Sequence, residues 1–106
     1  MYLQGSNVQA DIDGLAEQAG AAARLMKLLA NERRLLVLCR LAGAGEMTVG
    51  ALAASVGLSQ SALSQHLSLM RAEGLVRFRR EGQTLHYAIA DPIAKRLLST
   101  LREIYC

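Results

Sequence analysis

The chain has 106 residues, of which 52% are hydrophobic and 20% charged, with nine glycines and one proline. This composition excludes a disordered or low-complexity protein and indicates a single globular domain. No apolar run approaches the roughly 20 residues of a membrane span, and the N-terminus lacks the layout of a secretory signal, so we expect a cytoplasmic protein without a membrane partner. The net charge of +3 favours an anionic partner such as nucleic acid.

The first residues stand apart from the rest of the chain. The opening MYLQGS resembles the remnant of a tag-cleavage site, so residues 1–10 are expected to be such a remnant or a flexible N-terminus. The folded domain is expected over residues 11–106. From Asp11 to Ala30, apolar residues recur every three or four positions, which predicts an amphipathic helix.

The second predicted helix begins after Asn31, a residue type that caps helix N-termini. Its sequence is ERRLLVLCRLAG, and Gly43 and Gly45 are expected to end it. The apolar stripe expected to face the core consists of Leu35, Leu38, Cys39 and Ala42.

Two further helices follow, joined by a glycine turn. Thr48 is expected to cap a short helix that ends near Ser55, and Gly57 supplies the turn. Ser59 then caps a longer helix that runs to Glu73, where Gly74 stops it. Two helices joined by such a turn predict a helix-turn-helix.

The longer helix has an apolar side and an almost uncharged polar side. Leu63, Leu67 and Met70 are expected to face the core. A solvated helix face usually carries Lys and Glu, whereas Ser and Gln offer the donors and acceptors that read base edges in a major groove. The alternative is an ordinary soluble helix that is rich in Ser and Gln. The outer positions are Gln60, Ser61, Ser64, Gln65 and Ser68.

After Gly74 the apolar period changes from three or four to two, which predicts a β-hairpin. Val76 and Phe78 should point one way and Arg77 and Arg79 the other, followed by a turn at Glu81-Gly82 and a return strand with Leu85, Tyr87 and Ile89. Arg77, Arg79 and Arg80 suit DNA phosphates or a minor groove. The alternative is an edge hairpin kept soluble by arginines.

The last predicted helix opens with Asp91 as N-cap and Pro92 in the first turn. The first and last helices carry broader apolar faces than a small core needs, so their surplus is expected to bury against a second copy. The apolar side of the last helix comprises Ile93, Leu97, Leu98, Leu101, Ile104 and Tyr105.

The expected fold is therefore mainly α with a β-hairpin wing, in the order α-α-α-α-β-β-α. The segments LLANERRLLVLCRL, LAASVGLSQSALSQHLSLMRAEGLV and RREGQTLHYAI resemble the ArsR family of winged helix-turn-helix repressors over about residues 15–106. The resemblance implies a homodimer held by the first and last helices, with its recognition helices in successive major grooves of a palindromic double-stranded operator. The family pattern assigns operator contacts to Ser59, Gln60, Ser61, Ser64, Gln65 and His66, with Arg77, Arg79 and Arg80 on the wing.

The two cysteines, Cys39 and Cys106, match the sulfide- and persulfide-responsive branch of that family. The resemblance implies that they are sensing thiols, which reactive sulfur species cross-link to release the operator. A direct disulfide needs Cα atoms within about 7 Å, and each added sulfur extends the reach. A general oxidant switch, a DNA-binding anti-silencer, and a structural role in which Cys39 is a small core residue remain open alternatives.

Other classes of function fit less well. One metal-sensing pattern of the family needs Cys-x-Cys where this chain has EMTVGAL, and another needs Asp-x-His where it has DPI, so we expect no metal site. No paired carboxylates, nucleophile-base set or phosphate-binding glycine motif is present, so we expect neither catalytic residues nor a cofactor. A module that binds a non-DNA partner remains the other alternative.

Overall fold

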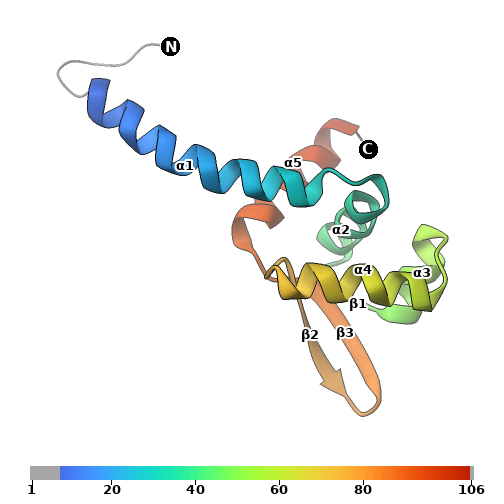
Figure 1. Ribbon diagram of the computed structural model, residues 1–106. Helices are drawn as coiled ribbons and strands as arrows, with labels where there is room; N and C mark the ends of the chain where they lie inside the picture. Colours follow the sequence, from blue (N-terminus) through green and yellow to red (C-terminus); the bar gives the residue numbers. More distant parts are fainter. Residues whose placement is uncertain (1–7, 106) are drawn as a thin grey trace. The chain divides into compact units, whose positions relative to one another are not determined.

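The computed structural model describes residues 8–105, with side-chain burial from residue 12 onward. The prediction about Cys106 and the interpretation of residues 1–7 lie outside this part of the chain. Helix α1 (Val8–Leu29) forms one compact unit and begins at Val8 rather than Asp11 (Figure 1). Residues from 31 onward form a second unit, which comprises α2 (Glu32–Ala44), β1 (Met47–Thr48), α3 (Val49–Val56), α4 (Gln60–Ala72), β2 (Val76–Glu81), β3 (Thr84–Ile89) and α5 (Pro92–Tyr105).

The predicted starts of the other four helices are confirmed by their capping hydrogen bonds. The side-chain oxygens of Asn31, Thr48 and Ser59 each accept the backbone N–H three residues further on, at 3.0, 3.2 and 3.1 Å. Asp91 also caps α5, because its Oδ1 accepts the N–H of Ile93 at 2.9 Å and that of Ala94 at 3.4 Å. Each cap satisfies a backbone donor that the helix itself leaves without a partner.

The buried face of α2 differs from the predicted stripe. Leu38 is fully buried as predicted, but its buried companions are Val37 and Leu41. Helix α2 packs against α3, α5 and β3. The buried residues still recur every three or four positions, but their stripe is rotated about the helix axis from the predicted one. The remaining members of the predicted stripe are half-buried: Leu35, Cys39 and Ala42.

A third strand completes the sheet. The strand order is β1-β3-β2, all antiparallel, and β1 pairs with β3 through Met47 opposite Tyr87 and Thr48 opposite His86. The sequence analysis missed β1 because two residues are too few to show a period of two. Since β3 is the central strand, Tyr87, Ala88 and Ile89 are all buried, and the predicted alternation is absent there.

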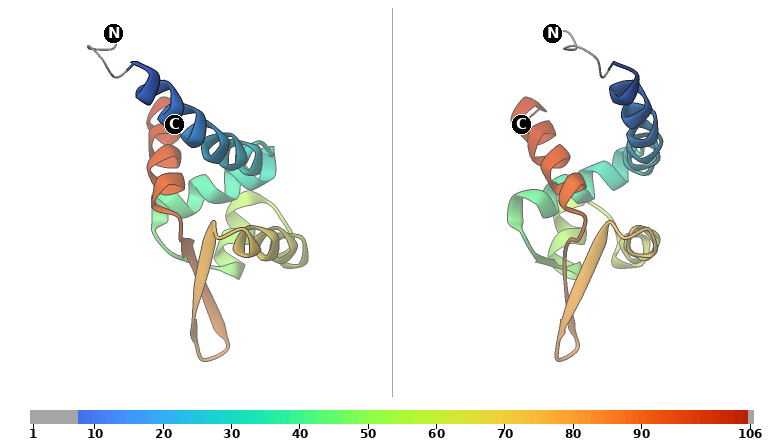
Figure 2. Two further views of the ribbon diagram at one scale, coloured as in Figure 1. Left: turned by 60° about the vertical axis from the view of Figure 1, so that its left-hand side comes forward. Right: turned by 90° about the vertical axis from the view of Figure 1, so that its left-hand side faces the viewer.

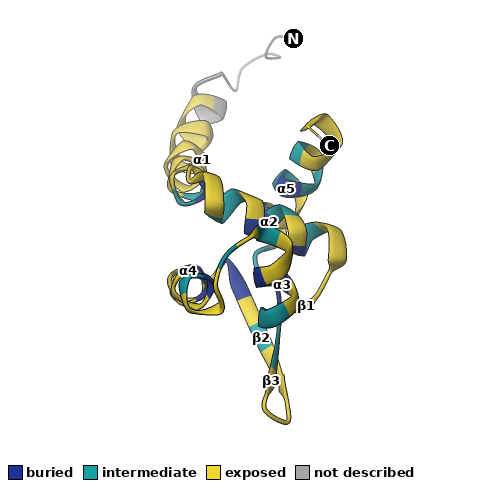
Figure 3. Ribbon diagram, turned by 90° about the vertical axis from the view of Figure 1, so that its right-hand side faces the viewer, coloured by how far each residue is buried: buried dark blue, intermediate teal, exposed yellow. Residues whose placement is uncertain are grey.

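The hairpin of β2 and β3, which we call the wing (residues 76–89), extends away from helices α2 to α5 (Figure 2). In β2 the predicted alternation is present, with Val76 buried, Phe78 half-buried and the intervening Arg77 exposed. Glu81 pairs with Thr84, so the turn lies one residue later than predicted. Figure 3 shows that the base of the wing is buried and its tip exposed.

The predicted apolar side of helix α5 is broad, and only part of it is buried. Ala94 and Leu98 are fully buried. Ile93 and Ile104 are 70% and 66% exposed, and their spacing with the half-buried Leu97 places all three on one side of the helix. None of the helices in the described part of the chain combines the length and apolarity needed to cross a bilayer.

The turn between α3 and α4 is built on Gly57, which adopts a left-handed conformation with φ of 69°. The N–H of Leu58 donates to the carbonyl of Ala53 at 3.1 Å, which closes the end of α3. This turn sets the angle between the two helices. A residue with a Cβ atom pays a steric penalty in this conformation.

We expect Gly57→Ala to destabilise the fold by about 1–2 kcal/mol, because nothing crowds a Cβ there and the strain is purely in the backbone. Thermal or urea unfolding would measure the change. Gly57→Asn is the matched control and should lose less stability, since Asn tolerates the left-handed region. Equal losses for the two variants would contradict this explanation.

Candidate nucleic-acid interface

Helix α4 presents one fully buried side and one exposed polar side. Leu63, Leu67 and Met70 are at most 1% exposed, as predicted. Their burial holds the opposite side toward solvent, where four exposed residues form what we call the polar face of α4: Ser61, Ser64, Gln65 and Ser68. These four line one shallow groove together with Leu69, an exposed leucine that the sequence analysis did not include.

Two further predicted contact residues, Ser59 and Gln60, lie at the start of α4 and outside its polar face. Ser59 is exposed, but its hydroxyl accepts the N–H of Ala62 as the helix cap. Gln60 lines a second groove, which the start of α4 forms with the start of α3 and the tip of the wing. Ser64 lines both grooves, so the polar face of α4 continues toward the wing.

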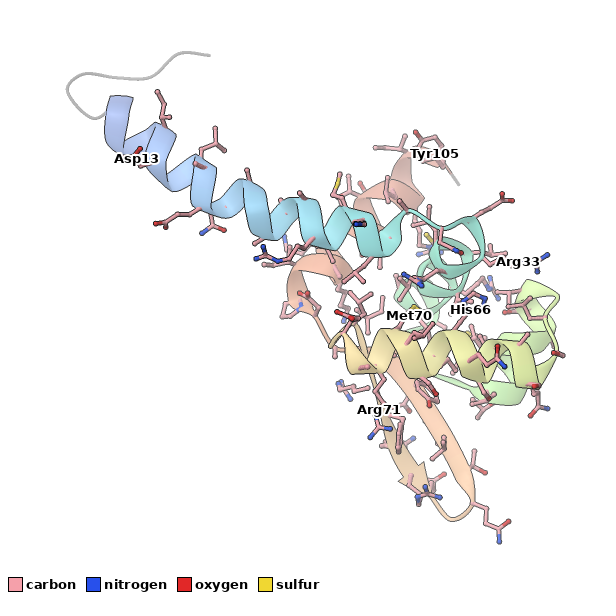
Figure 4. All side chains as sticks on the ribbon, in the orientation of Figure 1. Asp13, Arg33, His66, Met70, Arg71 and Tyr105 are labelled. Atoms are coloured by element: carbon pink, nitrogen blue, oxygen red, sulfur yellow. The ribbon has the colours of Figure 1, made fainter. Side chains whose placement is uncertain are left out.

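His66 lies on another side of α4. It is half-buried and lines a pocket of about 480 Å³ with Asn31, Glu32 and Arg33 at the start of α2. Figure 4 shows His66 and Arg71 extending from different sides of the same helix. The structure therefore separates His66 from the polar face, although the sequence analysis grouped them.

The three predicted wing arginines are all exposed, but they differ in their ion pairs. Arg79 binds Glu46, with Nη2 and Nε both within 3.0 Å of the carboxylate, and its Nη1 lies 3.2 Å from Oε2 of Glu81. Two carboxylates thus balance the charge of Arg79. This arrangement ties β2 to the residue that precedes β1, which the sequence analysis did not predict.

A short row of ionisable groups crosses this face of the sheet. His86 lies opposite Arg79 in the β2–β3 register, with Nδ1 3.9 Å from Glu46 and Nε2 3.6 Å from Glu81. The hydrogen bond from Arg79 lowers the pKa of the Glu46 carboxyl below its usual range. The same bond, followed by that to Glu81, raises the pKa of Arg79.

Arg71 is a second contact that the sequence did not reveal. It lies in the last turn of α4, and its guanidinium carbon is 4.3 Å from the centre of the Phe78 ring on β2. The two residues are separated by the turn between α4 and the wing, so no helical spacing or strand register links them. The contact places an exposed cation in the corner between α4 and the wing.

Cys39 lies on α2, half-buried and four residues before Gly43, so the two residues share one side of the helix. The guanidinium of Arg102 on α5 lies so close to Gly43 that a Cβ there would be 2.6 Å from it. The Arg102 side chain, from the last turn of α5, therefore lies against the side of α2 that carries Cys39. Within the described residues, no group of three or more His, Cys, Asp and Glu side chains is placed to hold a metal ion.

The lowered pKa of Glu46 makes its ion pair with Arg79 dependent on pH. A carboxyl whose pKa is depressed in the folded state stabilises the fold at neutral pH, and the contribution is lost as the pH falls through the depressed value. We expect an NMR titration of the Glu46 carboxyl carbon to give a midpoint below the usual value of about 4.3. In Arg79→Gln the midpoint should rise; an unchanged midpoint would contradict the assigned cause.

Comparison with known proteins identifies the family of this chain. The model of the bacterial regulatory protein arsR family matches residues 31–77. The transcriptional activator HlyU of Vibrio cholerae serotype O1 is 40% identical over 105 residues, which cover 99% of this chain and 94% of that protein.

Solved structures have the same arrangement of elements. The transcriptional regulator HlyU from Vibrio vulnificus superposes with a TM-score of 0.85 at 42% identity, covering 91% of this chain and 99% of that one. Mb0332 from Mycobacterium bovis, described as a homodimeric winged helix-turn-helix DNA-binding domain, has a TM-score of 0.68 at 35% identity, covering 98% and 89%. This chain is thus a winged helix-turn-helix transcriptional regulator that belongs to the arsR family of bacterial regulatory proteins.

Proposed function

We propose that the protein is a homodimeric repressor that binds a palindromic operator through α4 and the wing. In this proposal it releases the operator when reactive sulfur species link Cys39 to Cys106. The observation that carries the DNA-binding part is the polar face of α4, which is exposed, uncharged and continuous with a groove that reaches the tip of the wing.

The side chains of the polar face of α4 can form hydrogen bonds with base edges. Gln side chains can donate and accept at once, and they pair with the N6 and N7 positions of adenine. Serine hydroxyls also donate and accept, and they are short enough to let the helix backbone approach the bases. Gln65 is therefore the strongest candidate for a base contact, with Ser61, Ser64 and Ser68 beside it. Weaker roles are assigned to Ser59, whose hydroxyl caps the helix, to His66, which lines the pocket at the start of α2, and to Arg79, which is paired with Glu46. Gln60 lines the groove that reaches the wing and is a further candidate for a base contact.

Exposed apolar side chains support a dimer. Ile93 and Ile104 share one side of α5 with Leu97, and Tyr105 in the last turn is 80% exposed. In helix α1, Ile12, Leu15 and Met26 are also exposed. A second copy would bury these surfaces, and the homodimeric description of Mb0332 agrees with this assembly. Two α4 helices related by a two-fold axis would meet half-sites about 34–36 Å apart.

The contact between Gly43 and Arg102 supports the sulfur-sensing part of the proposal. It places a side chain from the last turn of α5 against the side of α2 on which Cys39 lies. A covalent bridge between these two helices would change how α5 packs. Since α5 is proposed to hold the dimer, the spacing of the two recognition helices would change with it, and the operator would fit less well.

The cross-link can form from inorganic polysulfide alone. One thiolate takes a sulfur atom and becomes a persulfide, while the polysulfide leaves one sulfur shorter. The second thiolate attacks the sulfur bound to carbon, which forms the disulfide and expels hydrosulfide. Two persulfides instead condense to a trisulfide and release hydrogen sulfide. The longer bridge suits cysteines that are too far apart for a direct disulfide.

We expect Gln65→Ala to weaken binding to an operator selected from random duplexes by about 10-fold, the lower part of the range for one base contact. A mobility-shift titration measures this loss. Binding to an unrelated duplex of the same length is the internal control and should be unchanged, because Gln65 carries no charge. Equal losses on both duplexes would argue against base reading, and a wild-type protein that selects no duplex would favour a module for a non-DNA partner.

We expect Cys39→Ser to bind the operator as the wild type does but to resist release by inorganic polysulfide. Intact-mass spectrometry should show a wild-type monomer that gains sulfur or loses two hydrogens and resists alkylation until reduced. Cys39→Ser should show no such cross-link. Cys106→Ser is the matched variant and should behave in the same way.

Parallel treatments separate this sensor from its alternatives. Release by peroxide as efficiently as by polysulfide would indicate a general oxidant switch, and release by zinc would indicate a metal sensor. If Cys39→Ser were still released by polysulfide, the thiol pair would not be the sensing element. Loss of operator binding by the unreacted variant would assign Cys39 a structural role.

A further inference from the structure

The stacked pair of Arg71 and Phe78 is a cation held in a defined place. The guanidinium lies 4.3 Å from the centre of the ring, within the distance at which a cation is attracted to an aromatic face. The Phe78 ring is held in place by packing, because its centre lies 5.4 Å from the ring centre of the buried Tyr87 on the neighbouring strand. Figure 4 shows Arg71 extending from α4 toward β2, so the charge bridges the recognition helix and the wing.

Arg71 has no acidic partner in the described part of the chain. Arg79 and His86, by contrast, lie within 4 Å of the carboxylates of Glu46 and Glu81. The charge of Arg79 is therefore balanced by carboxylates at the sheet, whereas no carboxylate among the described residues balances the charge of Arg71. Stacking uses one face of the guanidinium plane and leaves its N–H groups at the edge available to an anion.

The corner between α4 and the wing is also where a DNA backbone must pass. If α4 occupies a major groove and the wing lies over the adjacent minor groove, the sugar-phosphate strand that divides the two grooves runs between them. An arginine at this position meets phosphate oxygens rather than base edges. A planar guanidinium can bind such oxygens through two parallel N–H groups.

We propose that Arg71 binds a backbone phosphate of this strand and that Phe78 is the positioning residue that holds the guanidinium ready. This inference rests on the proposed operator binding. It adds a contact outside the polar face of α4 that strengthens binding without reading sequence. The contact should make the affinity depend more steeply on salt concentration, because each phosphate neutralised by a cation releases counterions from the duplex.

The test is a set of operator titrations over a range of salt concentrations. Arg71→Gln should lower the slope of log affinity against log salt by about 0.9, the value for one phosphate contact. It should weaken the selected operator and an unrelated duplex by the same factor. Arg71→Lys should restore most of the slope, since it restores the charge.

Phe78→Leu tests the positioning role. It keeps an apolar side chain but removes the ring face, so we expect a loss of affinity of about two- to fivefold, the worth of an exposed cation–π contact. In the Arg71→Gln background the same change should cost nothing further in DNA binding. Equal costs in both backgrounds would mean that Phe78 acts only through the fold.

Arg40→Gln is the matched control for net charge. Arg40 is an exposed arginine of α2 outside both grooves of α4, so its loss should leave the slope unchanged. The inference is overturned if Arg71→Gln has the wild-type slope while Gln65→Ala still weakens the operator. If the wild-type protein selects no duplex at all, the proposed function fails and this inference falls with it.

Discussion

The burial of Leu63, Leu67 and Met70 is the constraint on which the rest of the structure depends. These side chains are almost completely removed from water, so α4 cannot rotate about its axis without exposing them. This fixed rotation determines the direction in which each other side chain of α4 points. Gln65 and the serines around it face solvent, whereas Arg71 points to the wing and His66 to the start of α2.

The three wing arginines differ in whether their charge is available to an anion. The net charge of +3 and the cluster of three arginines indicate an anion-binding surface. Arg79, however, is held by Glu46 and Glu81, and this arrangement ties β2 to the start of β1 across the face of the sheet. Arg77 and Arg80 carry no such pairing within the described residues. Counting arginines therefore overestimates the charge available to DNA.

The packing of α2 on α5 links the proposed sensor to the proposed dimer. Gly43 lets the guanidinium of Arg102 approach the α2 backbone, and Cys39 lies one turn earlier on the same side. Helix α5 carries a buried side toward its own protomer and an exposed apolar side. A covalent change on α2 would therefore act on the helix that a second copy is proposed to contact, which is the physical basis of the proposed coupling between thiol chemistry and DNA binding.

The sequence by itself determined the features that depend on near neighbours. Helix caps at Asn31 and Ser59, the turn at Gly57 and the buried side of α4 follow from local hydrogen bonding and the helical period, and each was predicted correctly. Only the tertiary structure decided the pairing of β1 with β3, the ion pair between Glu46 and Arg79 and the contact of Arg71 with the Phe78 ring. These contacts join residues from different elements, and no local period encodes them, because they form only when packing brings the elements together.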